Sequence, residues 1–286
     1  MRRNRGVMVR SRGVSAATGL LLLTGCSAAG LLAADPVDAP TTPRATVSRA
    51  GALSPAETDA ALSEALLRLN SATTARFTFV NALPGGEDRM IVLVDRDKAL
   101  RDEQSTLGVS RTPSGARRVH RVLTKTHVYL NLDTFWGTHA GKFTKTPVAK
   151  MLAERGWYTP PDDRIAPAYL KDAVPKEGTS NPDGSAQFTA EVPLREALSL
   201  LGMEQLILRS AGDPSTVTGT LPITVRIDAN GRLTTVTAAG KDATAVTGLS
   251  PTPLRTLLAV TSTQEFADID APVTITVPRD DQVIAS

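Results

Sequence analysis

Residues 219–237 read GTLPITVRIDANGRLTTVT, and this stretch decides the expected fold. Its first half alternates apolar with polar residues, as a strand with one buried face does. The apolar positions are Leu221, Ile223, Val225 and Ile227. Asn230-Gly231 is a strong hairpin signal, and residues 232–238 then run back as a second strand. The stretch therefore predicts an antiparallel hairpin.

The same alternation recurs along the chain. It predicts strands over residues 76–80, 89–95, 117–132 and 273–277. Turn residues separate the earlier strands at Pro84-Gly85-Gly86 and at Pro113-Ser114-Gly115. Clusters of Gly and Pro of this kind favour antiparallel hairpins.

Three helices are expected around these strands. Ser54 precedes Pro55 and Glu57 in a capping-box pattern, which predicts a helix ending near Asn70. A second helix is predicted over residues 147–155 and a third over residues 194–202. The order of elements predicts one domain of α+β class, a long antiparallel sheet with helices packed on one face.

The strands supply a broad apolar face for this sheet. Ten residues are candidates for the lining of a ligand cavity: Phe77, Phe79, Val92, Val94, Val128, Leu130, Phe188, Ile223, Val225 and Ile227. In one interpretation they form an ordinary filled core. In the other, a curved sheet and its helices leave a cavity of roughly 300 to 1,000 Å³ for an apolar ligand.

The N-terminus has the form of an export signal. Five arginines lie within residues 1–12, and residues 13–25 carry no charge. Leu23-Thr24-Gly25-Cys26 resembles the bacterial lipobox, and Cys26 is the only cysteine of the chain. The resemblance implies cleavage before Cys26, a diacylglycerol on its sulfur, and anchoring on the extracytoplasmic face of the cell membrane. Sec and Tat export both stay open.

Removing the predicted signal peptide, residues 1–25, changes the charge balance. The whole chain has 32 Lys and Arg against 29 Asp and Glu. Removing five arginines leaves 27 basic against 29 acidic residues, so basicity gives no argument for nucleic-acid binding. Residues 26–52 are rich in Ala, Pro and Thr, which predicts a tether, and residues 53–286 form the predicted domain.

Chemical motifs are few. With three histidines and one cysteine, no Cys/His metal spacing exists. His120 and His127, seven residues apart, are expected on opposite faces of a strand as surface or partly buried residues. Asp228 begins a pattern like a calcium loop, but Ala239 stands where the bidentate Glu would fall. The acidic pair Asp162-Asp163 is expected to be a solvated turn. We expect the protein to have no enzymatic activity and to bind no metal or cofactor.

Several segments together resemble the LolA-like lipoproteins, and in particular the actinobacterial LppX/LprG group. They are the lipobox, the tether, HVYLNLDTFW at residues 127–136, the hairpin at 219–237, and FADIDAPVTITVP at 266–278. The resemblance implies a curved antiparallel sheet, a half-open barrel, with helices on its concave face. It implies a membrane-anchored carrier of a lipid or lipidated ligand, and we expect the protein to be a monomer. The alternative is an envelope sensor or protein-interaction module with a filled core.

Overall fold

The structure, a computed structural model, describes residues 50–84, 86–108, 117–131, 141–155, 165–209 and 213–284. All of them belong to one unit, Thr46–Ser286. The predicted signal peptide, Cys26 and nearly all of the predicted tether lie outside the described residues. Residues 51 and 52, the last two of the predicted tether, already pair in the first strand.

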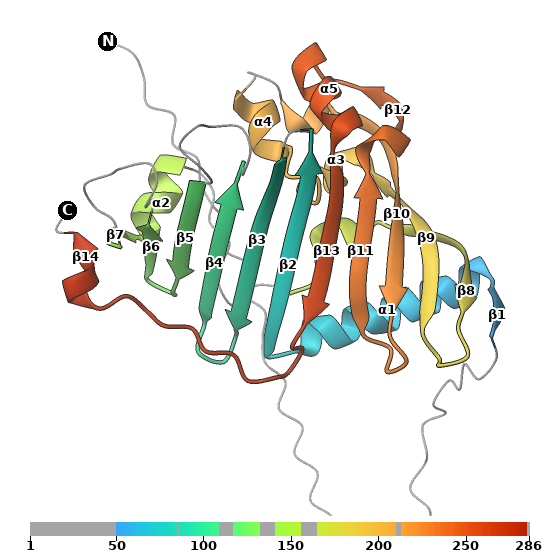
Figure 1. The fold of residues 1–286 in the computed structure, drawn as a ribbon, viewed down its shortest axis with the longest axis horizontal. Coiled ribbons are helices and arrows are strands. Elements are labelled where there is room, and N and C mark those ends of the chain that lie inside the picture. The colour runs from blue at the N-terminus through green and yellow to red at the C-terminus, as the bar shows by residue number, and fades with distance from the viewer. Residues whose placement is uncertain are drawn as a thin grey trace, which may run out of the picture. The chain divides into compact units, whose positions relative to one another are not determined.

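A large sheet dominates the described residues (Figure 1). In chain order its strands are β1 (Gly51–Leu53), β2 (Thr74–Leu83), β3 (Gly86–Asp95), β4 (Leu100–Leu107), β5 (Arg117–Leu123), β6 (His127–Asn131), β7 (Phe143–Pro147), β8 (Val174–Ser180), β9 (Ala186–Pro193), β10 (Thr218–Ile227), β11 (Leu233–Ala239), β12 (Thr244–Thr247), β13 (Thr261–Ala267) and β14 (Val283–Ile284). The helices are α1 (Pro55–Ser71), α2 (Val148–Arg155), α3 (Leu194–Ala197), α4 (Glu204–Arg209) and α5 (Pro251–Ala259).

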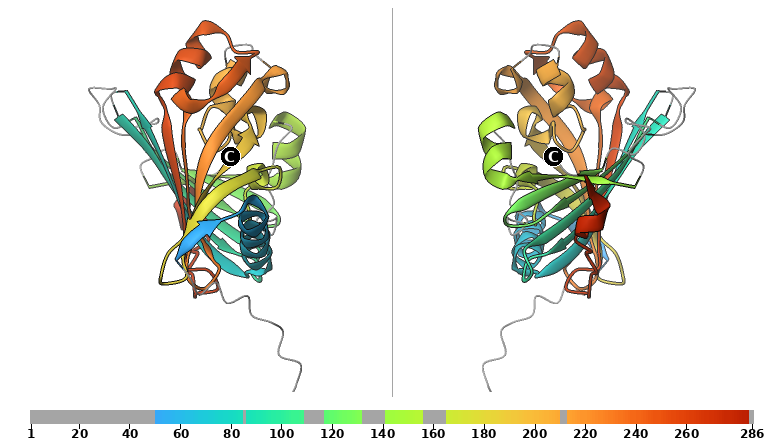
Figure 2. Two further views of the ribbon diagram at one scale, coloured as in Figure 1. Left: turned by 90° about the vertical axis from the view of Figure 1, so that its right-hand side faces the viewer. Right: turned by 90° about the vertical axis from the view of Figure 1, so that its left-hand side faces the viewer.

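The spatial order of the strands is β1-β8-β9-β10-β11-β13-β2-β3-β4-β5-β6-β7-β14, with β12 beside β10. Neighbours are antiparallel except β7 and β14, which are parallel. The sheet twists and curls towards the side that carries α1 and α2 (Figure 2), and it does not close. The predicted α+β class with a half-open antiparallel sheet is confirmed.

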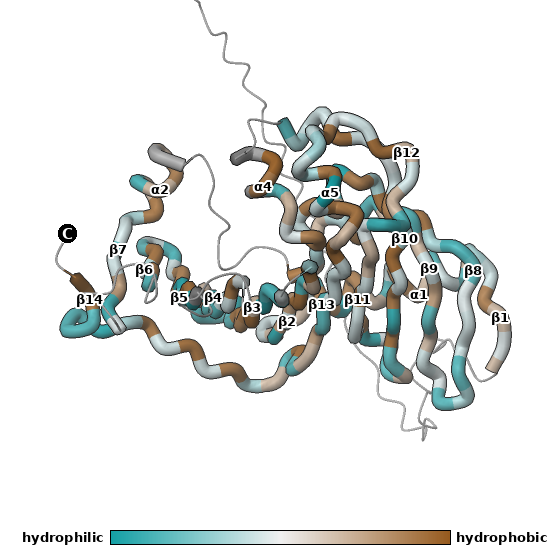
Figure 3. Tube along the Cα trace, turned by 45° about the horizontal axis from the view of Figure 1, so that its top comes forward, coloured by the Kyte–Doolittle hydropathy of each residue, from teal (hydrophilic) through white to brown (hydrophobic). Residues whose placement is uncertain are grey.

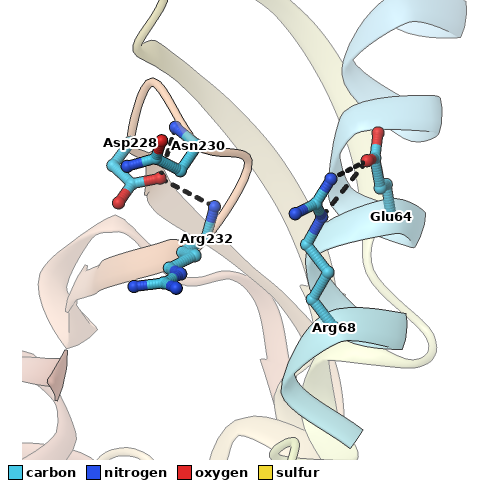
Figure 4. Close-up of polar contacts among 5 residues, drawn as sticks. All are labelled: Glu64, Arg68, Asp228, Asn230 and Arg232. Carbon is cyan, nitrogen blue, oxygen red and sulfur yellow. Dashed lines mark hydrogen bonds and ion pairs between the residues drawn. The ribbon is translucent and has the colours of Figure 1, made fainter. Parts of the chain in front are cut away.

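The hairpin predicted from residues 219–237 is β10 and β11. Asp228 fixes its turn, because the carboxylate Oδ1 accepts hydrogen bonds from the backbone N–H of Asn230 at 2.8 Å and of Arg232 at 2.9 Å (Figure 4). Gly231 has φ +72°, the left-handed region that glycine enters without strain. The calcium-like pattern is thus a hairpin turn, as expected.

Helix α1 begins where the sequence predicts. The hydroxyl of Ser54 accepts from the Glu57 N–H, and the Glu57 carboxylate accepts from the Ser54 N–H at 2.8 Å, which completes the capping box. Hydrogen bonds from Ser54 lower the pKa of Glu57. On the surface of α1, Arg68 pairs with Glu64 one turn earlier, beside the β10–β11 turn (Figure 4). The cap fixes where α1 begins, and its buried residues Leu62, Ala65 and Leu69 join the main hydrophobic cluster.

Two differences in the helices follow from tertiary packing. The third predicted helix is only α3, and the chain turns at Gly202 with φ +64° while its leucines stay buried. Helix α5 is not predicted. Prolines occupy two of its first three positions and obscure the helical spacing of its apolar residues. Prolines in the first turn are compatible with a helix, since the N–H groups there have no helical partner.

The register divides the sheet into two faces, because residues paired across antiparallel strands point to the same side. One register row runs across seven strands on what we call the helix-covered face: Val225, Val236, Gln264, Phe79, Met90, Ser105 and Val119. The main hydrophobic cluster contains residues of this face together with residues of α1 and α3. The other side is the opposite face.

The last predicted strand, residues 273–277, is wrong. After β13 the chain runs through what we call the C-terminal strap, residues 268–282, which crosses in front of the sheet in Figure 1 and has no strand assignment. Ile275 and Val277 pack against Val122, Tyr129 and Phe143 on the opposite face. The alternation correctly predicts that one side of this segment is buried. The segment is buried against the face of the sheet, however, and not by pairing with a neighbouring strand.

The prediction that His120 and His127 lie on opposite faces is also wrong. It assumes one continuous strand, whereas residues 124–126 form a turn between β5 and β6. Val122 pairs with Tyr129, so both histidines lie on the opposite face. Both are partly buried, as expected.

Candidate functional site

The ten predicted cavity residues lie on one face of one sheet. Their strands pair directly at Phe77 with Val92, Phe79 with Met90 and Phe188 with Val225. The register then places all ten on the helix-covered face: Phe77, Phe79, Val92, Val94, Val128, Leu130, Phe188, Ile223, Val225 and Ile227. The period-2 pattern therefore predicts their common direction correctly, although nothing in the structure tests their contact with a ligand.

Burial separates these ten residues into two groups. Eight are at most 5% exposed, whereas Phe79 and Leu130 are only partly buried. Phe79 and its partner Met90 pack at the margin of the main hydrophobic cluster. The face thus has a buried part and a partly exposed part.

Helices contact the flanks of this face. Helix α1 packs on β8, β10 and β11, α3 packs on β9 and β10, and α2 contacts β7. In Figure 3, α2 lies at the β7 end of the sheet, whereas α4 lies above β3 and α5 above β13 and β11. The partly exposed Phe79, Met90 and Leu130 belong to the strands between these flanks.

Two buried polar contacts interrupt the apolar face along β13. The Tyr169 hydroxyl donates to Oε1 of Gln264 at 2.5 Å, and Ser262 Oγ lies 2.6 Å from Asn81 Oδ1 and 2.5 Å from the Leu200 carbonyl oxygen. Burial raises the pKa of Tyr169, so this hydroxyl stays protonated. These contacts tie η1 (Ala168–Leu170) and the segment after α3 to the sheet.

A charged cluster occupies the same face at β4 and β5. Arg101 Nε donates to Glu103 Oε1 at 2.7 Å, and Arg121 Nη1 donates to Glu103 Oε2 at 2.8 Å. The side chain of Glu103 is 11% exposed, that of Arg101 20% and that of Arg121 30%. Sequence reasoning missed this cluster because β4 reads LRDEQSTL, whose polar composition hides a strand. The sequence did contain one signal for the cluster. Arg101 and Glu103 carry opposite charges two residues apart, a spacing that a strand places on the same face.

A second polar group lies on the opposite face. His120 Nε2 is 3.0 Å from Asp102 Oδ1, and the His120 ring meets Phe143 edge to face at 5.2 Å between centroids. Next to it, Asn131 Oδ1 is buried without a hydrogen-bond partner in the described part of the chain. The sheet separates this group from the ten apolar candidates, so the two do not form one site.

Several predicted features lie outside the described residues. They are Cys26 with the lipobox, the third histidine His139, and the acidic pair Asp162-Asp163. Among the residues that the structure does describe, no three His, Cys, Asp or Glu side chains gather in a way that could hold a metal ion. No helix in the same ranges has both the length and the hydrophobicity that crossing a bilayer requires.

Comparison with known proteins gives matches in structure only. No family model matches the chain, and no curated protein matches its sequence. The crystal structure of the Mycobacterium tuberculosis lipoprotein LppX is similar with a TM-score of 0.40 and 11% identity, over 76% of this chain and 99% of that chain. An uncharacterized conserved protein from Thermus thermophilus is similar with a TM-score of 0.36 and 12% identity, over 79% of this chain and 98% of that chain. LppX belongs to the group that the sequence resembles.

Proposed function

We propose that this chain is a membrane-anchored extracytoplasmic lipoprotein that binds and carries a lipid or other apolar ligand on the helix-covered face of its sheet. One observation carries the proposal. The apolar face extends beyond the strands on which α1 and α3 pack, onto β2, β3 and β6, where Phe79, Met90 and Leu130 remain partly exposed. Apolar side chains that are directed inwards but incompletely covered are what an acyl chain would contact.

Native mass spectrometry of the full chain, purified from its own host, tests this function. We expect a bound lipid that survives purification. Phe79→Asp should reduce the bound fraction, because it places a charge on the helix-covered face. Val80→Asp is the matched control, since Val80 is the next residue on β2, is equally only partly buried and points to the opposite face. A consistently empty wild-type protein would contradict the carrier function.

The anchor is a separate part of the proposal. The lipobox ending at Cys26 and the basic, then uncharged, residues before it support lipidation and processing at this cysteine. Two acyl chains bind a membrane far more durably than one. Cys26→Ala should therefore release the protein from the membrane or leave its signal uncleaved, as fractionation and intact-mass measurement would show. A variant that is still lipidated and membrane-bound would refute this assignment.

One observation favours a second candidate, a sensor or interaction module with a filled core. Eight of the ten predicted cavity residues are at most 5% exposed, as residues of a solid core are. Crosslinking in cells separates the candidates. A stable protein partner without bound lipid would favour the interaction module, and a lipid adduct on the helix-covered face would favour the carrier.

A further inference from the structure

The charged cluster of Arg101, Glu103 and Arg121 has no part in the function as proposed so far. We propose that it binds the anionic group of the carried ligand, a phosphate or carboxylate, so that the ligand is an anionic amphiphile whose head group lies at β4 and β5. This inference rests on the proposed function, because it places the head group on the face that would hold the acyl chains.

Strand pairing places the cluster inside an apolar surround. Glu103 pairs with Val92 on one side and with Arg121 on the other, and Arg121 pairs with Leu130. In the adjacent row, Arg101 lies between Val94 and Leu123. Val92, Val94 and Leu123 are buried. The three partly buried charges therefore stand among apolar residues of the helix-covered face.

The contacts of Arg101 leave part of its guanidinium unused. Its Nε donates to Glu103, while its two terminal nitrogens meet no acceptor within the described ranges of the chain. A guanidinium has five N–H donors in a planar fork that matches a carboxylate or a phosphate. The side chain is 20% exposed, and its terminal nitrogens are not among the fully buried unpaired atoms of the described residues, so an incoming ligand can reach them. An anionic oxygen would satisfy them.

The charge around Arg101 points to the same ligand. Its ionic partner, the Glu103 carboxylate, is shared with Arg121, so Arg101 does not have a full negative charge to itself. A charge removed from water is costly unless it has a partner, and charge-assisted hydrogen bonds to oxyanions are among the strongest in proteins. An anion placed at Arg101 would complete the neutralisation of its guanidinium.

The neighbouring row identifies a lipid head group as the source of the anion. One row beyond Glu103, in the direction of Phe79, the same face carries Met90 and Ser105. Phe79 and Met90 are the partly exposed apolar pair of the carrier proposal. An amphiphile with its head at Arg101 would lay its chain along this pair, whereas a free phosphate would use only the cluster.

Equilibrium titration of the delipidated full chain in nonionic detergent tests the inference. The probes are dioleoyl phosphatidic acid and dioleoylglycerol, which share acyl chains and differ in the anionic group. We expect phosphatidic acid to bind about tenfold more tightly. Arg101→Gln should abolish this preference and leave the affinity for dioleoylglycerol unchanged. Arg226→Gln is the matched control, because Arg226 is a strand arginine on the opposite face that contacts Gln187.

Glu103→Gln supplies a variant with the opposite sign. It keeps the size of the side chain, removes the negative charge and leaves both arginines, so the preference for phosphatidic acid should increase. This variant decides the question if Arg101→Gln does not fold. An unchanged or weaker preference in folded Glu103→Gln would overturn the inference.

The outcomes distinguish this inference from the carrier function. Wild-type protein that binds both lipids equally would overturn the head-group site and leave the carrier function standing. Wild-type protein that binds neither lipid would overturn the carrier function. Displacement of phosphatidic acid by inorganic phosphate at similar concentrations would assign the cluster to a free anion and overturn the lipid head group.

Discussion

Two parts of the same sheet differ in which side chains they bury and in what covers them. In the helix-packed half, β8 to β11, the inward residues are mostly apolar, and α1 and α3 cover them. In the β4–β7 half, charged Arg101 and Glu103 occupy inward positions, and the C-terminal strap covers apolar residues of the opposite face. One sheet therefore combines a tightly packed apolar core with a second part in which inward charges replace apolar side chains and pack less favourably. We place the head group of the ligand in this second part and its chain along the neighbouring strands β2 and β3.

The largest expected effect is a loss of stability when a large apolar side chain is truncated, and it should differ between the two parts. Ile223→Ala, in the helix-packed half, should lower the free energy of unfolding by about 2 to 5 kcal/mol, because its surroundings are closely packed. Leu130→Ala, in β6, should cost about 1 kcal/mol, because this side chain already keeps partial exposure. Chemical denaturation of both variants measures the difference. Equal losses would mean that the two parts are packed alike.

The next effect concerns the charged cluster. Glu103→Gln should lower stability by about 1 to 3 kcal/mol, because two partly buried guanidinium groups lose their shared carboxylate. Glu64→Gln is the control. Its ion pair with Arg68 is half exposed on α1, and such pairs contribute about 1 kcal/mol or less. If both variants unfold at the same denaturant concentration, Glu103 is solvated like a surface acid.

A smaller effect is expected where the strap begins. Asp270 has φ +59°, and its Oδ1 accepts from the Thr73 N–H at 2.9 Å. Asp270→Ala should cost about 1 to 2 kcal/mol, because it loses this acceptor and puts alanine in the left-handed region. Asp270→Asn keeps both properties and should behave like wild type. Hydrogen exchange would show faster exchange near Thr73 in the alanine variant alone, and equal exchange in both variants would contradict this role.

The smallest effect is a pH dependence at the start of α1. Since hydrogen bonds from Ser54 lower the pKa of Glu57 in the folded state, its contribution to stability is present above the unfolded pKa. That contribution is lost as the pH falls through the lowered folded pKa. Glu57→Gln should remove this part of the acid dependence, and its unfolding curves should converge with those of wild type at low pH. A difference that persists unchanged in acid would contradict the assignment.

The sequence predicts those parts of the fold in which local pattern and tertiary role agree. The hairpin of β10 and β11 and the capped helix α1 carry complete local signals, namely Asn230-Gly231 and the Ser54–Glu57 box. Within each strand, the common direction of the apolar candidates follows from period 2. These features need no knowledge of distant contacts.

Other parts depend on contacts between residues far apart in the chain. The strap alternates like a strand, but its burial comes from Val122 and Tyr129, more than 140 residues earlier in the chain. Strand β4 is polar because its inward residues include a charged cluster that only pairing with β5 completes. The candidate site was therefore predictable in its apolar part and not in its charged part.

Photo-crosslinking in the native host tests the central claim most directly. A benzophenone amino acid at position 79 would lie on the helix-covered face, and the same residue at position 80 would lie on the opposite face. We predict a lipid adduct at position 79, detected by intact mass, and none at position 80. Adducts at neither position, or at both alike, would contradict a lipid carried on the helix-covered face.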